Sequence, residues 1–256
     1  YSGIRLWGSI GFIVTVAGLG PLLGAFGTKL LPVVVLLLFS LIWLSSLAVP
    51  ESAAGHLPID QVPLRQVLKQ PVVLAMLAIC FLVQASHGPY YAFFSLYLGD
   101  YGYSTTVIGQ LWALGVIAEV GVFLNMHNWL PRFGARRLLI VATVLTSLRW
   151  VLLAWFVDHL WMMVITQTLH AASFGLYHAV AIHLIHRLFR GRHQGRGQAL
   201  YSSLSFGAGG AVGSFAAGYL WEGLGAEWMY MAAAISAISS RINGRLKRRF
   251  FFRFSR

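Results

Sequence analysis

The sequence predicts an all-α, polytopic membrane helical bundle, and three observations support that class. Of the 256 residues, 58% are hydrophobic and only 10% are charged, whereas a soluble domain carries about 25% charged residues. The mean hydropathy is +0.71. The apolar residues also gather in runs of about 20, the length that crosses a bilayer as a helix. A water-soluble fold could not bury so much apolar surface, so we expect most of it to face lipid.

Eight apolar segments follow one another along the chain. Seven are long enough to span a membrane, at residues 7–27, 30–49, 71–98, 107–126, 138–157, 161–185 and 199–220, and an eighth at 229–240 looks cut short. Pro89, in the third segment, predicts a kink or partial unwinding, which is tolerated where the backbone lines a cavity. Gly209 and Gly213 form a small-xxx-small pair that favours close packing of helices, with hinge motion as the alternative.

Charge is unevenly distributed among the connections. The chain has 19 Lys and Arg residues against 7 Asp and Glu residues, a formal net charge of +12. Connections 127–137 and 186–198 are strongly basic and the long connection 50–70 is polar, whereas 99–106, 157–159 and 221–228 carry acids and no Lys or Arg. If the segments alternate in direction, all basic connections fall on one side, which the positive-inside rule makes cytoplasmic. Topology therefore accounts for the charge, and we expect a lipid bilayer rather than nucleic acid as the partner.

The order of the segments predicts the domain organisation. Residues 1–49 would be the last two helices of the N-terminal half of a two-half transporter, 50–70 a central cytoplasmic linker, and 71–240 the six-helix C-terminal half. The chain opens with "YSGIRLWGS" rather than Met, and we interpret it as a fragment that lacks its N-terminus. The basic tail, 241–256, follows a short apolar run, which suggests a truncated or altered C-terminus. Cys80 is the only cysteine, so no intrachain disulfide can form.

Two residues of opposite charge lie inside apolar segments. Arg149 interrupts "VLTSLRWVLLAW", and Glu119 lies within "WALGVIAEVGVFL". An arginine at the centre of a lipid-embedded helix costs about 2.5–3.5 kcal/mol on insertion scales. Facing each other, or a water-filled cavity, the two groups would neutralise and recover part of the desolvation cost. We expect them to take part in transport, with a structural ion pair between two helices as the alternative.

Histidines mark the sixth segment. His170 lies near mid-depth, and His178 follows eight positions later, about 80° around an α-helix, so both can face one cavity. A histidine beside a carboxylate can take up and release protons. We therefore assign proton coupling to Glu119, Arg149 and His170, against the alternative that His170 is a satisfied interior hydrogen-bonding group. The histidine spacing does not favour a metal site, and no metal is expected.

A pocket for an organic ligand is expected around the third segment. Gln84 and His87 are one helical turn apart, on one face, and Tyr91 follows the next turn. The other candidate substrate-binding residues are Trp112, Arg149, Trp150 and His178; lipid contact or packing is the alternative for the two tryptophans. The sequence holds no P-loop, GxSxG, HExxH or CxxC motif. We expect no enzyme, no use of ATP and no cofactor other than the proton as coupling ion.

Several stretches resemble one known family. "YSGIRLWGSIGFIV", "LVQASHGPYYAFFSLYLGDYGYS", "IGQLWALGVIAEVGVF" and "TLHAASFGLYHA" are similar to the phenylpropionic acid transporter family of the major facilitator superfamily, which is related to lactose permease. The resemblance implies the major facilitator fold of twelve helices in two halves, of which this chain would hold about eight. It also implies alternating access and proton symport.

The resemblance assigns roles to individual residues. Glu119, Arg149 and His170 match three coupling residues of lactose permease. Ser173 stands where that permease has a second glutamate, regarded as its proton site. The proton would therefore be carried by Glu119 or His170, or coupling would be absent. In the mechanism we expect, protonation of Glu119 releases Arg149, which then binds a substrate carboxylate through two parallel hydrogen bonds.

Together these inferences predict a secondary active transporter for a small-molecule substrate. We expect proton-coupled uptake of a small organic acid such as 3-phenylpropionate, by a multi-pass protein of the bacterial inner membrane that is a monomer at full length. A sugar or nucleoside proton symporter, a drug efflux pump and a non-functional fragment are the alternatives.

Overall fold

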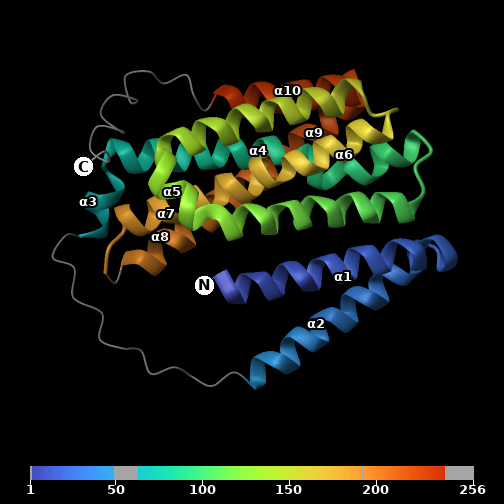
Figure 1. Ribbon diagram of the computed structural model, residues 1–256, viewed down its shortest axis with the longest axis horizontal. Helices are drawn as coiled ribbons and strands as arrows, with labels where there is room; N and C mark the ends of the chain where they lie inside the picture. The colour runs from blue at the N-terminus through green and yellow to red at the C-terminus, as the bar shows by residue number, and fades with distance from the viewer. Residues whose placement is uncertain (1, 49–62, 192, 240–256) are drawn as a thin grey trace.

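The computed structural model describes residues 2–48, 63–191 and 193–239, and the regular structure in these ranges is entirely helical (Figure 1). In chain order the elements are α1 (Ser2–Phe26), the 3₁₀ turn η1 (Thr28–Leu30), α2 (Leu31–Leu47), α3 (Leu64–Leu68), α4 (Pro71–Asp100), α5 (Thr105–Trp155), α6 (Leu160–His170), the π-helical turn η2 (Ala171–Leu176), α7 (Tyr177–Leu188), α8 (His193–Ser202), the π-helical turn η3 (Ser203–Gly209), α9 (Gly210–Leu224) and α10 (Ala226–Ser239).

The predicted membrane helical bundle is confirmed. Within the described ranges, five helical stretches are long and apolar enough to cross a membrane, at Trp7–Phe26, Thr28–Leu47, Pro71–Asp100, Thr105–Trp155 and Leu160–Leu188. All eight apolar segments of the sequence coincide with helices, because 107–126 and 138–157 are the two legs of α5. The predicted linker, 50–70, and tail, 241–256, lie mostly or wholly outside the described residues, and the end of the linker forms α3.

The chain reverses inside α5 at Gly134. We expected residues 127–137 to form a loop, but the backbone stays helical up to Gly134, whose φ of 75° and ψ of 150° break the helix. A positive φ is readily adopted only by glycine, so one residue suffices for the reversal. The two legs run antiparallel (Figure 1). At the other end, Ser104 caps α5 by accepting a hydrogen bond from the Val107 N–H at 3.3 Å.

The connections lie at two opposite ends of the bundle (Figure 1). Residues 63–70, the Gly134 reversal and residues 189–191 lie at one end, which we call the basic end. Residues 27–30, 101–104, 156–159 and Gly225 lie at the other, which we call the acidic end. Successive helices therefore alternate in direction, as the assignment of charged connections to two sides assumed. The basic connections lie together at one end.

Helices α1 and α2 form a hairpin beside the main body (Figure 1). Helix α1 packs against the first leg of α5, where a Cβ added at Gly20 would lie 2.8 Å from the Thr105 carbonyl oxygen. Helix α2 has no buried residue, and its exposed side chains include Leu36, Phe39 and Trp43. Such an apolar, exposed helix suits lipid or a further helix as its surroundings.

Helix α4 crosses α9 at very short range. A Cβ added at Gly213 would overlap the Ala85 carbonyl, one at Gly88 would overlap the Gly213 backbone, and one at Gly209 would lie 2.8 Å from the Phe81 carbonyl oxygen. The expected close packing through Gly209 and Gly213 is therefore present. Glycine is required at this crossing because the two backbones themselves are in contact.

Helix α4 is continuous through Pro89, so the partial unwinding predicted there is wrong. Proline removes the hydrogen bond to the carbonyl four residues earlier, which here is that of Ala85. That carbonyl faces Gly213 of α9. Close packing of α9 thus covers the position that the missing bond exposes, and the helix does not need to unwind.

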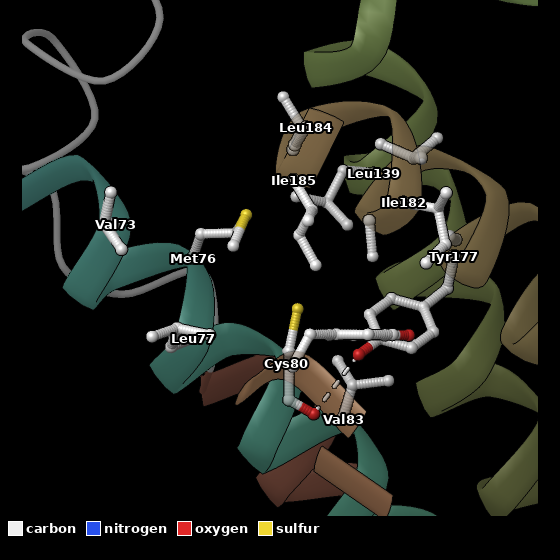
Figure 2. Close-up of a cluster of buried hydrophobic side chains, with 14 of the residues drawn as sticks. Val73, Met76, Leu77, Cys80, Val83, Leu139, Tyr177, Ile182, Leu184 and Ile185 are labelled. Atoms are coloured by element: carbon white, nitrogen blue, oxygen red, sulfur yellow. Dashed lines mark hydrogen bonds between the residues drawn. The ribbon is translucent and has the colours of Figure 1, made fainter. Parts of the chain in front are cut away.

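Two apolar cores fill the bundle, one toward each end. The core toward the basic end joins α4, α5, α7 and α8, and Figure 2 shows Met76 and Cys80 of α4 facing Ile185 and Tyr177 of α7. The Tyr177 hydroxyl donates to the Cys80 carbonyl at 3.2 Å. Cys80 is a buried core thiol with 2% exposure.

The core toward the acidic end is aromatic, with Tyr90, Phe94, Tyr97, Trp150 and Tyr230 all buried. Tyr97 lies inside this core, and its hydroxyl donates to the Ala154 carbonyl at 3.2 Å. Between the two cores lies a layer of buried polar side chains.

Candidate functional site

The buried polar layer defines the candidate site. We call it the polar cluster, and it comprises residues of α4, both legs of α5, α6 and η2: Gln84, His87, Glu119, Arg149, Gln167, His170 and Ser173. All seven are buried. Such residues are rare inside membrane segments because each must find a partner or contact water, so a cluster of them is a functional-site candidate.

Arg149 lies at the centre of the polar cluster and is fully buried. Its Nε donates to the Thr166 carbonyl at 2.9 Å, Nη1 to Ser173 Oγ at 3.1 Å and Nη2 to Gln167 Oε1 at 3.5 Å. These three partners are uncharged and come from α6 and η2. The guanidinium is therefore bound to the neighbouring span by neutral acceptors.

Two aromatic rings pack on the guanidinium. The Arg149 Cζ lies 4.1 Å from the centre of the Tyr90 ring and 4.6 Å from that of Trp150. Both rings have no measurable exposure. A cation over a desolvated aromatic face gains about 2 kcal/mol or more, so the rings offset part of the cost of burying the charge.

Glu119 lies beside His170, on the leg of α5 that precedes Arg149. The distance from His170 Nε2 to Glu119 Oε2 is 3.9 Å, and both side chains are 6% exposed. The packing of α5 on η2 is close here, since a Cβ added at Gly175 would lie 2.8 Å from Glu119 Cγ. The absent side chain at Gly175 lets the carboxylate approach the imidazole.

Tyr90 and Gln167 are part of the site, although the sequence analysis did not select them. The Tyr90 hydroxyl donates to Gln167 Oε1 at 2.9 Å, and the same oxygen accepts from Arg149. Gln167 precedes His170 by three residues, so helical spacing would have placed both on one face. No spacing pattern marked Tyr90, because it is one of many aromatic residues in this segment.

His170 and His178 are brought into one column of rings by Phe174. The centroids of His170 and Phe174 are 5.5 Å apart with an interplanar angle of 4°, and those of Phe174 and His178 are 5.7 Å apart at 3°. Six of the seven residues between His170 and His178 form the π turn η2. A π turn rotates each residue by less than the α-helical value of about 100°, which reduces the expected offset between the two histidines.

His178 also contacts a neighbouring helix. Its Nδ1 lies 2.9 Å from the hydroxyl of Tyr201 in α8, and Tyr201 is fully buried. Tyr201 and Phe174 carry no signal in the sequence that would mark them as site residues. His178 therefore belongs to a contact toward the basic end, one ring away from His170.

Within the polar cluster, His87 packs edge to face against Trp150. Their ring centroids are 5.0 Å apart at 81°. His87 Nδ1 donates to the Val83 carbonyl at 2.8 Å, since a carbonyl only accepts. Trp150 Nε1 donates to Ser86 Oγ at 3.3 Å. Both side chains have fixed orientations.

Tyr91 and Trp112 form the accessible aromatic surface of the site. Their rings are stacked at 6.3 Å and 15°, and Tyr91 is 44% exposed. Trp112 Nε1 donates to Ser95 Oγ at 3.1 Å, and its ring lies 4.5 Å from that of Tyr90. The accessible rings thus adjoin the ring that covers the guanidinium.

Some polar atoms of the cluster have unused hydrogen-bonding capacity. Among the described residues of the polar cluster, four buried atoms have no hydrogen-bond partner: Gln84 Oε1, His87 Nε2, Gln167 Nε2 and His170 Nδ1. Buried polar atoms are nearly always satisfied in proteins, and exceptions call for a functional explanation. These atoms could bind a substrate or water within the cluster.

A separate cavity of about 410 Å³ lies at the acidic end. Its lining includes Tyr101, Asp158, Glu227 and Trp228. None of the predicted site residues lines it, so the cavity is distinct from the polar cluster.

Comparisons with known proteins agree with this architecture. The family model described as the MFS_1 like family matches residues 1–232. A probable 3-phenylpropionic acid transporter of Escherichia coli is 28% identical over 247 residues, which cover 94% of this chain and 64% of the relative. A maltose permease of Geobacillus stearothermophilus is 30% identical over 246 residues, covering 91% and 59%.

A third relative, an uncharacterized transporter of Bacillus subtilis, is 25% identical over 244 residues, covering 93% of this chain and 60% of the relative. The chain therefore spans 59–64% of the length of these three relatives. All of them are transporters, in agreement with the expectation that the protein is not an enzyme.

Proposed function

Because the chain belongs to the MFS_1-like family of major facilitator transporters, we propose that the complete protein imports a small organic acid together with protons by alternating access. The observation that carries this proposal is the buried pair of Glu119 and His170, 3.9 Å apart, beside the buried cation Arg149. In a membrane protein of this family, ionisable groups at the centre of the bundle are candidates for the coupling site.

Proton binding is assigned to Glu119 and His170 as a pair. A carboxylate and an imidazole at this distance can share or exchange a proton, directly or through one water. Ser173 binds the guanidinium, and its hydroxyl does not ionise at physiological pH. Arg149 donates to three neutral acceptors, Thr166, Gln167 and Ser173. The guanidinium supplies a permanent positive charge next to the proton-binding pair.

Substrate binding is assigned to Arg149 and the aromatic surface formed by Tyr91 and Trp112. A substrate carboxylate would replace the neutral oxygens of Gln167 and Ser173 on the guanidinium, since charge-assisted hydrogen bonds are stronger than neutral ones. An aromatic ring attached to that carboxylate could stack on the accessible rings. The relative named as a probable 3-phenylpropionic acid transporter supports 3-phenylpropionate as the first substrate to test.

Sugar transport is the second candidate, because the maltose permease is the relative with 30% identity. A sugar carries hydroxyl groups and no carboxylate, so it would use the unsatisfied acceptors of Gln84 and His87 rather than the charge of Arg149. Competition for uptake separates the two candidates. An acid transporter would be inhibited by unlabelled aromatic acids, and a sugar transporter by maltose or galactosides.

Uptake of labelled 3-phenylpropionate by cells that express the protein at its full natural length tests the proposal. We expect accumulation that rises as the external pH falls and that Glu119→Gln abolishes, since an amide cannot take up the proton. Glu222→Gln, in the exposed part of α9, is the matched control and should accumulate substrate normally. Unchanged, pH-dependent accumulation by the Glu119→Gln variant would reject the role of Glu119.

A further inference from the structure

Phe174 separates two groups of proton-binding residues along one transmembrane span. On one side of its ring, His170 is paired with Glu119. On the other side, His178 contacts the Tyr201 hydroxyl at 2.9 Å, nearer the basic end. The three stacked rings are nearly parallel, so the phenyl ring fills the space between the two imidazoles.

A phenyl ring interrupts proton transfer because it has no hydrogen-bond donor or acceptor. Protons move between side chains that are hydrogen-bonded, at donor–acceptor distances of about 3 Å, or linked by water. The two imidazoles each lie more than 5 Å from the centre of the ring between them. No direct hydrogen bond can therefore join His170 to His178 while Phe174 keeps this position.

Within the described ranges, other side chains also lie around Phe174, and they differ in their capacity to carry a proton. Helix α4 presents His87, whose ring centroid is 6.4 Å away, and η3 presents Phe206 at 6.0 Å. From α5 the nearby ionisable groups are Glu119, already paired with His170, and Arg149, which is a donor only. The neighbouring Ser173 donates to the His170 carbonyl and accepts from Arg149.

We propose that Phe174 is a barrier that keeps the proton of the Glu119–His170 pair from passing to His178 and Tyr201. The proton can pass only when alternating access, driven by the substrate, moves the Phe174 ring. This inference rests on the proposed proton coupling and extends it. A proton leaving the pair toward the basic end would be accepted by a ring nitrogen of His178, with no other bond made or broken. Phe174 lies within the π turn η2, and π turns are frequent at functional sites in helices.

Proton flux in vesicles tests the barrier. The full-length protein is reconstituted in vesicles that contain a pH indicator, and proton entry is recorded under an imposed pH gradient, with and without 3-phenylpropionate. We expect Phe174→Ala to raise substrate-independent proton entry several-fold, because water can fill the vacated space. Phe174→His should do the same while keeping a flat ring of similar size, since imidazole can carry the proton across.

Two controls retain the barrier. Phe174→Leu keeps a bulky apolar side chain between the histidines and should remain as tight as the native protein. Phe206→Ala removes a ring that contacts His178, at 5.9 Å, without lying between the histidines, and should not leak.

The outcomes distinguish the two proposals. If the native protein couples substrate to proton entry and both Phe174→Ala and Phe174→His remain tight, the barrier is wrong and the proposed coupling stands. If the native protein shows no substrate-driven proton entry, the proposed coupling fails, and the role of the barrier fails with it. Equal leaks in Phe174→Leu and Phe174→Ala would also overturn the barrier.

Discussion

Arg149 shows how one residue can remain charged inside a membrane bundle. Its insertion cost, about 2.5–3.5 kcal/mol, is met by three hydrogen bonds and two aromatic faces. Hydrogen bonds to charged groups contribute about 1.5–3 kcal/mol each, so these contacts together can offset the cost. The same buried layer holds Glu119 and His170, 3.9 Å apart, which form the proposed proton pair.

Removing one acceptor from Arg149 should destabilise the protein measurably. Ser173→Ala leaves Nη1 without the 3.1 Å hydrogen bond, and we expect a loss of about 1–3 kcal/mol in unfolding free energy. Thermal unfolding of the detergent-solubilised protein measures it. Ser202→Ala changes an exposed serine in the same way and should leave the unfolding temperature unchanged. Equal effects of the two substitutions would contradict the assigned role of Ser173.

Arg149→Lys should lose function although it keeps the charge. An ammonium group cannot present the planar fork that reaches Thr166, Gln167 and Ser173 together. We expect uptake of 3-phenylpropionate to fall to background while the protein is still inserted. Arg190→Lys, at an exposed position near the basic end, is the control and should transport normally. Normal uptake by Arg149→Lys would show that charge alone suffices.

At the scale of the elements, glycines set how closely the helices approach. Gly88 and Gly213 let α4 and α9 cross with their backbones in contact, and Gly175 lets η2 receive Glu119 of α5. The two π turns lie on the spans that contribute to these contacts. With a larger residue in place of Gly175, Glu119 and His170 would have to separate or the helices would have to shift.

The α4–α9 crossing predicts a steep dependence on side-chain size. Gly213→Ala places a methyl group on the Ala85 carbonyl, and overpacking of this kind costs about 1–3 kcal/mol. The unfolding temperature in detergent should fall. Gly210→Ala meets no atom within 4 Å, and it should be neutral or slightly stabilising, because alanine favours helix. A tolerated Gly213→Ala would mean that the crossing is looser than described.

A methyl group at Gly175 should disturb coupling more than stability. It would press on Glu119 Cγ, 2.8 Å away, and move the carboxylate relative to His170. We expect Gly175→Ala to reduce pH-dependent uptake of 3-phenylpropionate. Gly121→Ala, with no atom within 4 Å on the same leg of α5 as Glu119, is the matched control. If both variants transport alike, the position of Glu119 does not depend on Gly175.

At the scale of the whole molecule, the chain alternates between a basic end and an acidic end (Figure 1). The positive-inside rule then predicts that the basic end is cytoplasmic. The native chain suits a labelling test, since Cys80 is its only cysteine and is buried. Cysteines introduced at exposed positions can therefore be labelled against a low background.

Orientation is tested by a membrane-impermeant maleimide added to intact cells. Glu222→Cys, near the acidic end, should react at once, and Arg190→Cys, near the basic end, should react only after the membrane is permeabilised. The protein without an introduced cysteine is the control, and Cys80, which is buried, should react in neither case. Labelling of both variants in intact cells would place the two ends on one side of the membrane and reject the topology.

The sequence by itself determined the membrane class, the helical segments and the residues that carry charge in the bilayer. These depend on local composition, because about 20 apolar residues suffice for a span and a charge within one stands out. Sequence reasoning thus found Glu119, Arg149 and His170. It missed Tyr90, Gln167 and Phe174, which look like ordinary residues of an apolar helix.

Tertiary structure alone decided which of those residues meet. Packing at Gly175 directs Glu119 to His170, neutral oxygens of α6 and η2 bind Arg149, and the α9 backbone covers the carbonyl that Pro89 leaves unbonded. Each outcome depends on how two helices approach, a property of both surfaces that the composition of one segment does not contain.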